Sequence, residues 1–254
     1  MIIRNDFEQA AAKQLAADLC CLPEDFFVYK NAVTLPGMRE GRRKFSGSPH
    51  FFRAATMGMG AVICADEAVT DYSRLLCSEK SGAEIFSAAT LAGLNNELRR
   101  HGCCIGVINE YFLPKSTSRP AVPHQGFDIR VFEGSDIELL YRWEGFDNAL
   151  LHRTIGERYD ILAVCAISGN VIMGIAGASR DSETMAQIGI DVLEQYRGMG
   201  IGSALASICA SEVMGMGMVP YYGTWMGNVI SRRLALHCGF YPAWCEMFSL
   251  QITD

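Results

Sequence analysis

The spacing of apolar residues near the start of the chain predicts two helices. One apolar stripe consists of Phe7, Ala11, Leu15 and Leu19. Its helix begins near Asn5 or Asp6, because either side chain can accept a hydrogen bond from the free amides of the first turn. A second stripe consists of Leu91, Leu94 and Leu98. Its helix ends at Gly102, after basic residues that suit the carbonyl end of a helix.

Apolar runs in the same half predict strands. Residues 49–65 predict two short strands, and residues 103–112 predict a third. The stretch 115–124 contains two prolines and small polar residues, so it can enter neither a helix nor a central strand. We therefore expect an N-terminal α/β domain of unknown role over 1–113, a linker over 114–124 and a second domain over 125–254.

The second domain has a different predicted order. Strands are expected at 127–132, 161–167, 171–178, 185–192, 219–224 and 244–252, and helices at 202–217 and 229–238. Ser168-Gly169-Asn170 reads as a hairpin turn, because glycine adopts positive φ at little cost. The segment Ser135–Glu138 has the capping-box pattern that begins a further helix. The mixed pattern predicts an antiparallel meander followed by alternating helices and strands.

Composition favours a folded protein without metal or disulfides. The 254 residues are 50% hydrophobic and 20% charged, and no apolar run of about 18 residues occurs. The chain turns polar at its fourth residue and shows no secretory pattern, so we expect a cytoplasmic protein. Of ten cysteines, Cys20-Cys21 and Cys103-Cys104 are adjacent pairs, and no C-x-x-C occurs. We expect reduced thiols and no metal site.

Charge is unevenly distributed. Residues 1–124 have a formal charge of +1, whereas residues 125–254 have −7 and no lysine. The acidic half favours a cationic partner over nucleic acid, although an acidic surface also serves solubility alone. A basic loop at Arg39–Lys44 is the one candidate for nucleic-acid binding, and no aromatic residues are interleaved with its charges.

A glycine-rich segment leads from the strand at 185–192 into the next helix. Its residues are Arg197, Gly198, Met199, Gly200, Ile201, Gly202 and Ser203. Glycines here bring backbone N–H groups together beside the positive end of the helix dipole, which suits a pyrophosphate. A P-loop needs Lys-Ser/Thr where Ser203-Ala204 stand, and a dinucleotide fingerprint needs glycine at Ser203 and a parallel sheet. The segment alone is equally consistent with an ordinary strand-to-helix turn.

A second pattern resolves the alternatives. It consists of Asn228, Ser231, Ala235, Gly239 and Phe240. Together with Arg197-x-x-Gly200-x-Gly202, it resembles the acyl-CoA-binding motifs of the GNAT superfamily of N-acetyltransferases over residues 126–254. The two-part layout is similar to the bacterial antibiotic-resistance-type branch with an added N-terminal domain. The resemblance implies an α/β (α+β) fold with a mixed, mostly antiparallel sheet, a splayed central strand pair and flanking helices.

The resemblance also implies where acetyl-CoA binds. Pantetheine would bond the backbone at Val192 and Leu193, and the pyrophosphate would lie on the glycine-rich segment. The cofactor-binding residues are then Val192, Leu193, Arg197, Gly198, Met199, Gly200, Ile201, Gly202, Ser203, Asn228, Ser231 and Arg232. Asn228 is equally suited to a helix N-cap. Arg232 is a candidate for the 3′-phosphate and equally a surface cation.

Catalytic candidates are harder to choose, because Ala235 stands where many members of the family carry a tyrosine acid. His237 lies about 160° around the helix from it and faces away. Tyr221 and Tyr222 face opposite sides of their strand, and Tyr222 is our candidate acid. The candidate bases are Glu183, Asp191 and Glu194, each also readable as a surface carboxylate. The Val192 N–H is expected to hold the oxyanion.

These residues predict an acetyl-CoA-dependent N-acetyltransferase. Direct attack of the primary amine of a small molecule on the thioester would transfer the acetyl group. The alternative is a non-catalytic acyl-CoA-binding or sensing protein, because Ala235 cannot protonate a thiolate. The expected partners are the amine and, as one option, a second copy in a homodimer, but neither nucleic acid nor a membrane.

Overall fold

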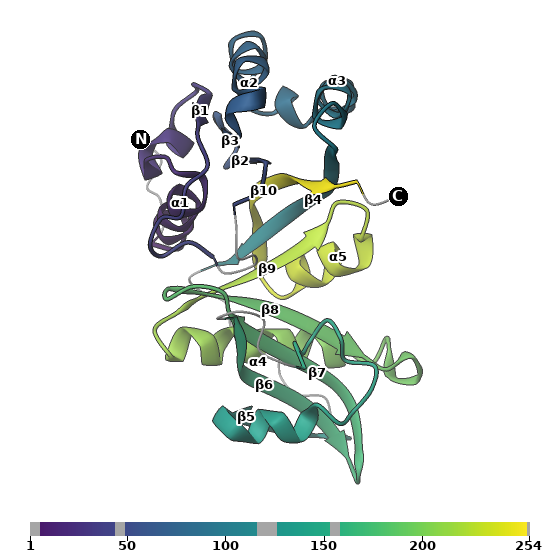
Figure 1. Ribbon diagram of the computed structural model, residues 1–254. Helices are drawn as coiled ribbons and strands as arrows, with labels where there is room; N and C mark the ends of the chain where they lie inside the picture. Colours follow the sequence, from purple (N-terminus) through teal and green to yellow (C-terminus); the bar gives the residue numbers. More distant parts are fainter. Residues whose placement is uncertain (1–5, 44–48, 116–125, 153–157, 253–254) are drawn as a thin grey trace. The chain divides into compact units, whose positions relative to one another are not determined.

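The computed structural model describes residues 6–43, 49–115, 126–152 and 158–252, and the chain divides into two compact units (Figure 1). Unit 1 comprises Met1–Tyr111, Thr224–Gly227 and Pro242–Asp254, and unit 2 comprises Phe112–Gly223 and Asn228–Tyr241. The end of the chain therefore belongs with its beginning, whereas the expected division was sequential. Residues 116–124 of the expected linker lie outside the described residues.

Unit 1 contains three α-helices among its described residues: α1 (Asp6–Leu19), α2 (Glu67–Glu79) and α3 (Ala88–Arg99). Short 3-10 helices occupy Pro23–Phe27 (η1) and Glu84–Phe86 (η2). Its strands are β1 (Ala32–Thr34), β2 (Phe52–Thr56), β3 (Ala61–Ala65), most of β4 (Cys103–Pro114) and most of β10 (Phe240–Gln251). They lie in the order β1-β3-β2-β10-β4. The predicted helices α1 and α3 and strands β2, β3 and β4 are confirmed.

Helices cover both faces of these strands. Phe52 and Ala54 of β2 pack with Leu76 of α2 and Leu94 of α3. Arg53, between them, points to the other face, where it reaches α1. Sequence analysis did not predict α2. The helix begins after its N-cap residue Asp66, whose side chain accepts a hydrogen bond from the Ala68 N–H.

A buried group of charges joins α1, β2 and β10 in unit 1. Asp18 and Glu246 form ion pairs with Arg43 and Arg53, and all four side chains are at most 10% exposed. Arg43 Nη2 lies 2.7 Å from Glu246 Oε1, which also accepts from Trp244 Nε1 at 2.7 Å. The group thereby fastens the C-terminal strand to the N-terminal helix.

Unit 2 contains the strands β5 (Asp128–Glu133), β6 (Tyr159–Ser168), β7 (Val171–Arg180), β8 (Met185–Val192) and most of β9 (Val219–Trp225). Its helices are η3 (Gly134–Leu140), η4 (Glu194–Tyr196), α4 (Ile201–Gly215) and α5 (Val229–His237). The strand order is β9-β8-β7-β6-β5, and only the β8–β9 pairing is parallel among these described strands. The predicted mixed, mostly antiparallel sheet is confirmed, and so is the hairpin turn, in which Gly169 has φ +59°.

The predicted capping box at Ser135–Glu138 is wrong. The segment forms the 3-10 helix η3, whose N-cap, Glu133, makes no side-chain cap hydrogen bond. Gly134, with φ +56°, turns β5 directly into η3. The two buried residues, Ile137 and Leu140, are three apart, which matches the three-residue turn of a 3-10 helix.

The two faces of the unit 2 strands have different covers. Helices α4 and α5 pack on one face, in a cluster that includes Ile188, Leu205 and Tyr222. The segment 146–150 crosses the other face directly over Gly177 and Gly189, which are partners on β7 and β8. A Cβ at either glycine would overlap a carbonyl oxygen of that segment. Close backbone approach therefore explains both glycines.

Candidate active site

Strand β8 pairs with β7 from Ala186 to Val192, but its pairing on the other side is much shorter. Its parallel ladder with β9 runs from Met185↔Val219 to Ile188↔Tyr222. Beyond Ile188, the described partners of β8 are on β7 alone, as far as Val192. The last four residues of β8 thus leave one edge open, which is the splayed strand pair that the resemblance implied.

The direction of the backbone groups on this open segment follows from one hydrogen bond. The Leu193 N–H donates to the Met173 carbonyl on β7 at 3.0 Å. Because backbone groups alternate between the two sides of a strand, those of Ile190 and Val192 point to the open edge. Leu193, expected to bond pantetheine, has its N–H engaged by β7 and its carbonyl engaged by the Tyr196 N–H at 2.9 Å. Ile190, which sequence analysis did not single out, has the orientation expected of Leu193.

The glycine-rich segment presents unbonded amides. Gly198 and Gly200 have φ of +81° and +77°, and Gly200 is the N-cap of α4. The Ser203 hydroxyl donates to the Gly200 carbonyl at 2.9 Å instead of capping the helix. Within the described residues, the N–H groups of the first turn of α4 therefore have no side-chain acceptor. Arg197 Nε donates to the Val192 carbonyl at 3.0 Å, which ties this segment to the open end of β8.

Helix α5 carries the second motif. Asn228 is its N-cap, because Oδ1 accepts from the Ser231 N–H at 3.1 Å. The cap uses the acceptor half of the amide and leaves its two donors for another partner. Ala235 is 2% exposed and packs against the core, whereas His237 is exposed, as predicted. Arg232 is half-buried.

The two adjacent tyrosines of β9 have different surroundings. Tyr221 is fully buried, and its hydroxyl donates to Asp181, so it is committed to a structural network. Tyr222 lies on the α4 and α5 face and is hydrogen-bonded to the side chain of Ser231. Burial raises the pKa of Tyr222, and the Ser231 hydrogen bond opposes this in part. The phenol is therefore protonated near neutral pH and able to donate.

The three candidate bases are far from equivalent. Glu183 and Glu194 are exposed and lie beyond opposite ends of β8, and those ends are about 23 Å apart at 3.3 Å per residue. Asp191 accepts from Asn148 Nδ2 at 2.7 Å, from the Asn148 N–H at 2.8 Å and from the Ala149 N–H at 2.9 Å. Its carboxylate thus holds the segment 146–150 against β8.

Replacement of Asp191 by alanine is expected to release this segment. Hydrogen bonds to a charged group contribute about 1.5–3 kcal/mol each, so amide protection at Asn148 and Ala149 should fall at least tenfold in hydrogen–deuterium exchange. Asp147→Ala is the matched control, because its side chain is 87% exposed. Equal protection in the two variants would contradict the anchoring role.

A buried polar network near Tyr221 gave no signal in the sequence. Asp181 is fully buried and bonds the side chains of Arg158, Ser179 and Tyr221. In the sequence, Asp181 stands in a polar stretch that reads as an ordinary loop. The approach of Arg158 across the sheet depends on strand register, which local pattern does not reveal.

The site thus combines an open strand edge, a glycine-rich turn and a helix N-terminus, features that fit an extended thioester ending in a pyrophosphate. Residues 131–240 match the model of the Acetyltransferase (GNAT) family. This part of the chain is an acetyltransferase domain of that family, an acyltransferase of the N-acetyltransferase type. The family uses acetyl-CoA as its acetyl donor.

Solved structures show similarity at low identity. A GCN5-related N-acetyltransferase-like protein from Streptococcus suis is 15% identical, with 62% of this chain and 67% of that chain covered and a TM-score of 0.45. A GCN5-related N-acetyltransferase from Kribbella flavida is 15% identical, with 64% and 65% covered and a TM-score of 0.48. An aminoglycoside N-acetyltransferase in complex with CoA is 22% identical, with 46% and 92% covered and a TM-score of 0.35.

All three TM-scores lie below 0.5, so the assignment of the domain rests on the family match. No curated protein matches the chain. Among the described residues, none of the helices has both the length and the apolar character that a membrane crossing requires. All ten cysteines are free thiols.

Proposed function

We propose that the protein transfers the acetyl group of acetyl-CoA to the primary amine of a small molecule. The observation that carries this proposal is the open edge of β8 leading directly to the unbonded amides at the start of α4. The backbone groups on the open edge of β8 suit the pantetheine arm, and the amides at the start of α4 suit the pyrophosphate. When bound, acetyl-CoA supplies an acetyl group activated as a thioester.

Residues on two elements would hold the donor. The backbone of Val192 bonds pantetheine, and the amides from Gly198 to Ser203 receive the pyrophosphate. The side-chain N–H groups of Asn228, which the helix cap does not use, would also donate hydrogen bonds to pantetheine. Arg197 and Arg232 are cations for the phosphates.

The reacting carbonyl belongs nearer to Ile190 than to Val192. Tyr222, the proposed acid, pairs with Ile188, which is four residues from Val192 or about 13 Å along the strand. The open-edge amide closest to Tyr222 is that of Ile190. We therefore propose that the Ile190 N–H would donate to the thioester oxygen of bound acetyl-CoA, and that Tyr222 would supply a proton to the sulfur.

The amine must lose a proton before or during attack. Asp191 already accepts hydrogen bonds from the segment 146–150. We therefore propose that it positions this segment and does not act as the base. Glu194 is four residues from Ile190 and Glu183 is seven, so either carboxylate would act through water. Glu194 is the nearer of the two and is our proposed base.

Calorimetry with acetyl-CoA and a thiol-release assay over a panel of amines test the function. Tyr222→Phe should leave acetyl-CoA affinity unchanged and lower kcat by about tenfold to a hundredfold, near the lower end of general-acid contributions, because a thiolate leaves readily. Tyr159→Phe, at a 40% exposed tyrosine of β6, is the matched control.

The outcomes separate the remaining alternatives. An absence of acetyl-CoA binding would contradict the proposed site. Tight binding without thiol release on any amine would favour the sensing protein over the enzyme. A wild-type kcat in Tyr222→Phe would remove Tyr222 from the mechanism without affecting the proposed binding site.

A further inference from the structure

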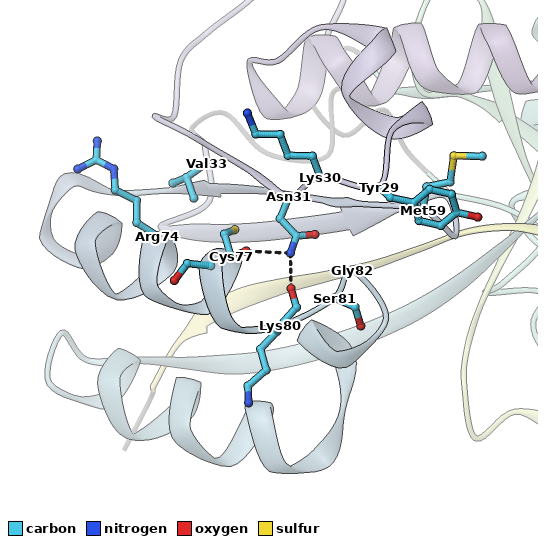
Figure 2. A pocket seen from close by; sticks show the side chains of 11 residues that line it. Tyr29, Lys30, Asn31, Val33, Met59, Arg74, Cys77, Lys80, Ser81 and Gly82 are labelled. Atoms are coloured by element: carbon cyan, nitrogen blue, oxygen red, sulfur yellow. Dashed lines mark hydrogen bonds between the residues drawn. The ribbon is translucent and has the colours of Figure 1, made fainter.

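Unit 1 contains a cavity of about 560 Å³ that the acetyl transfer does not use (Figure 2). Its wall comes from the stretch between η1 and β1, the turn between β2 and β3, the last turns of α2 and the loop after α2. The volume lies within the range of small-molecule sites, roughly 300–1,000 Å³. The cavity is therefore large enough for a ligand of metabolite size.

Internal contacts hold the wall in place. Asn31 Nδ2 donates to the carbonyls of Cys77 at 3.2 Å and Lys80 at 2.6 Å, and its Oδ1 accepts from the Ala61 N–H at 2.8 Å (Figure 2). At Gly82, a Cβ would lie 2.5 Å from the Met59 carbonyl oxygen, so the loop packs directly on the turn. These contacts make the cavity preformed, which lowers the entropic cost of binding.

The charged residues that line the cavity are all basic. They are Lys30, Arg74 and Lys80, and no described aspartate or glutamate is among the lining residues. Arg74 is paired with Asp71 at 3.1 Å. Just outside the lining, the Glu84 carboxylate accepts from the Ser81 hydroxyl at 2.8 Å and interacts electrostatically with Lys80. Figure 2 shows the side chains of Lys30 and Lys80 pointing in opposite directions, with their ammonium groups away from each other. Both side chains are long and flexible, so either lysine could turn toward an anion bound in the cavity.

Some of the carbonyl groups at the negative end of α2 are already hydrogen-bonded. The carbonyls of Cys77 and Lys80, at the end of the helix, already accept from Asn31. The Leu76 carbonyl accepts from the Lys80 N–H. These hydrogen bonds offset part of the negative partial charge at the end of the helix, which would otherwise repel an anion here.

The rest of the wall is apolar or aromatic. Val33, Met59 and Cys77 contribute apolar surface. Tyr29 is 87% exposed at the edge of the cavity, beside Met59 in Figure 2. An exposed aromatic ring of this kind is a surface on which a planar or aliphatic ligand can pack.

We propose that this cavity binds a small organic anion, a carboxylate or phosphate ester with an aromatic or aliphatic body. Lys30 and Lys80 recognise the anionic group, and Tyr29 packs against the body. The binding gives unit 1 a role of its own, and it does not depend on the acetyl-transfer reaction.

Hydrogen–deuterium exchange of the full chain with phenyl phosphate, benzoate and the neutral benzyl alcohol tests the proposal. Both anions should protect the amides of 29–33 and 77–82, and benzyl alcohol should not. Titration of the Lys30→Gln/Lys80→Gln variant should show at least tenfold weaker binding of phenyl phosphate. Lys13→Gln/Arg99→Gln removes the same charge from exposed sites elsewhere in unit 1 and should bind as the wild type does.

A third variant tests the body of the ligand. Tyr29→Ala should weaken phenyl phosphate several-fold without changing the affinity for inorganic phosphate. Three results would each overturn the proposal: no protection of these segments by either anion, equal protection by benzyl alcohol, or equal weakening in the Lys13/Arg99 variant. The last would mean attraction by net charge alone.

Discussion

Glu246→Gln is expected to lower the free energy of unfolding by about 3–5 kcal/mol, the usual cost of removing one partner from a buried ion pair. Glu246 is 1% exposed and bonds both Arg43 and Arg53. Without its charge, the two guanidinium groups would share Asp18 as the remaining described carboxylate of the group. Urea unfolding of the full chain measures the loss.

Asp71→Asn is the control for this variant. Asp71 pairs with Arg74 at 3.1 Å, and the two side chains are 97% and 68% exposed. An exposed pair of this kind contributes about 0.5 kcal/mol or less. If the two variants unfolded at the same urea concentration, the buried group would have no special role in stability.

The same carboxylate sets an acid limit on stability. Burial by itself would raise the pKa of Glu246, but Arg43 and Arg53 outweigh it and lower the pKa from 4.5 to about 2. Because the folded pKa lies below the unfolded one, the stabilisation is complete above about pH 4.5 and is lost as the pH falls toward about 2. The unfolding free energy of wild type should therefore fall more steeply over this range than that of Glu246→Gln.

Gly198→Leu is expected to weaken acetyl-CoA binding tenfold or more, a loss of about 1.4 kcal/mol or above. Gly198 has φ +81° and no atom within 4 Å of a Cβ built on it. The folded protein thus has room for a side chain that the proposed pyrophosphate would have to displace. Calorimetry with acetyl-CoA measures the change.

Gly217→Leu controls for the strain of a side chain at positive φ. Gly217 has φ +76° and equally open surroundings, but it follows the opposite end of α4. Both variants should lose about 1–2 kcal/mol of stability from the left-handed conformation. Only Gly198→Leu should lose acetyl-CoA affinity. Equal affinities in the two variants would place the pyrophosphate elsewhere.

Local pattern was sufficient for most of the elements. The hydrophobic runs at 185–192 and 219–224 correspond to β8 and β9, because a buried strand needs a continuous apolar sequence. The glycine-rich segment marked the start of α4 for a related reason, since only glycine adopts φ near +80° without strain. Helix α2 was missed because polar residues interrupt its narrow apolar stripe.

The two acidic residues of β8 and β10 show where local pattern fails. Asp191 read as a base candidate, and Glu246 carried no signal at all. Their partners, Asn148 and Arg43, are 43 and 203 residues away. Whether a carboxylate is free to accept a proton depends on such partners, and only folding brings them together.

Local pattern was enough to predict the strand–glycine–helix segment and its family, because tight turns and phosphate-binding amides depend on residues adjacent in the chain. Three features became visible only in the folded chain: Leu193 is bonded to β7, Ile190 and Val192 face the open edge, and the last strand belongs with unit 1. These features depend on strand register and long-range pairing, and a shift of one residue would reverse every side chain and amide involved.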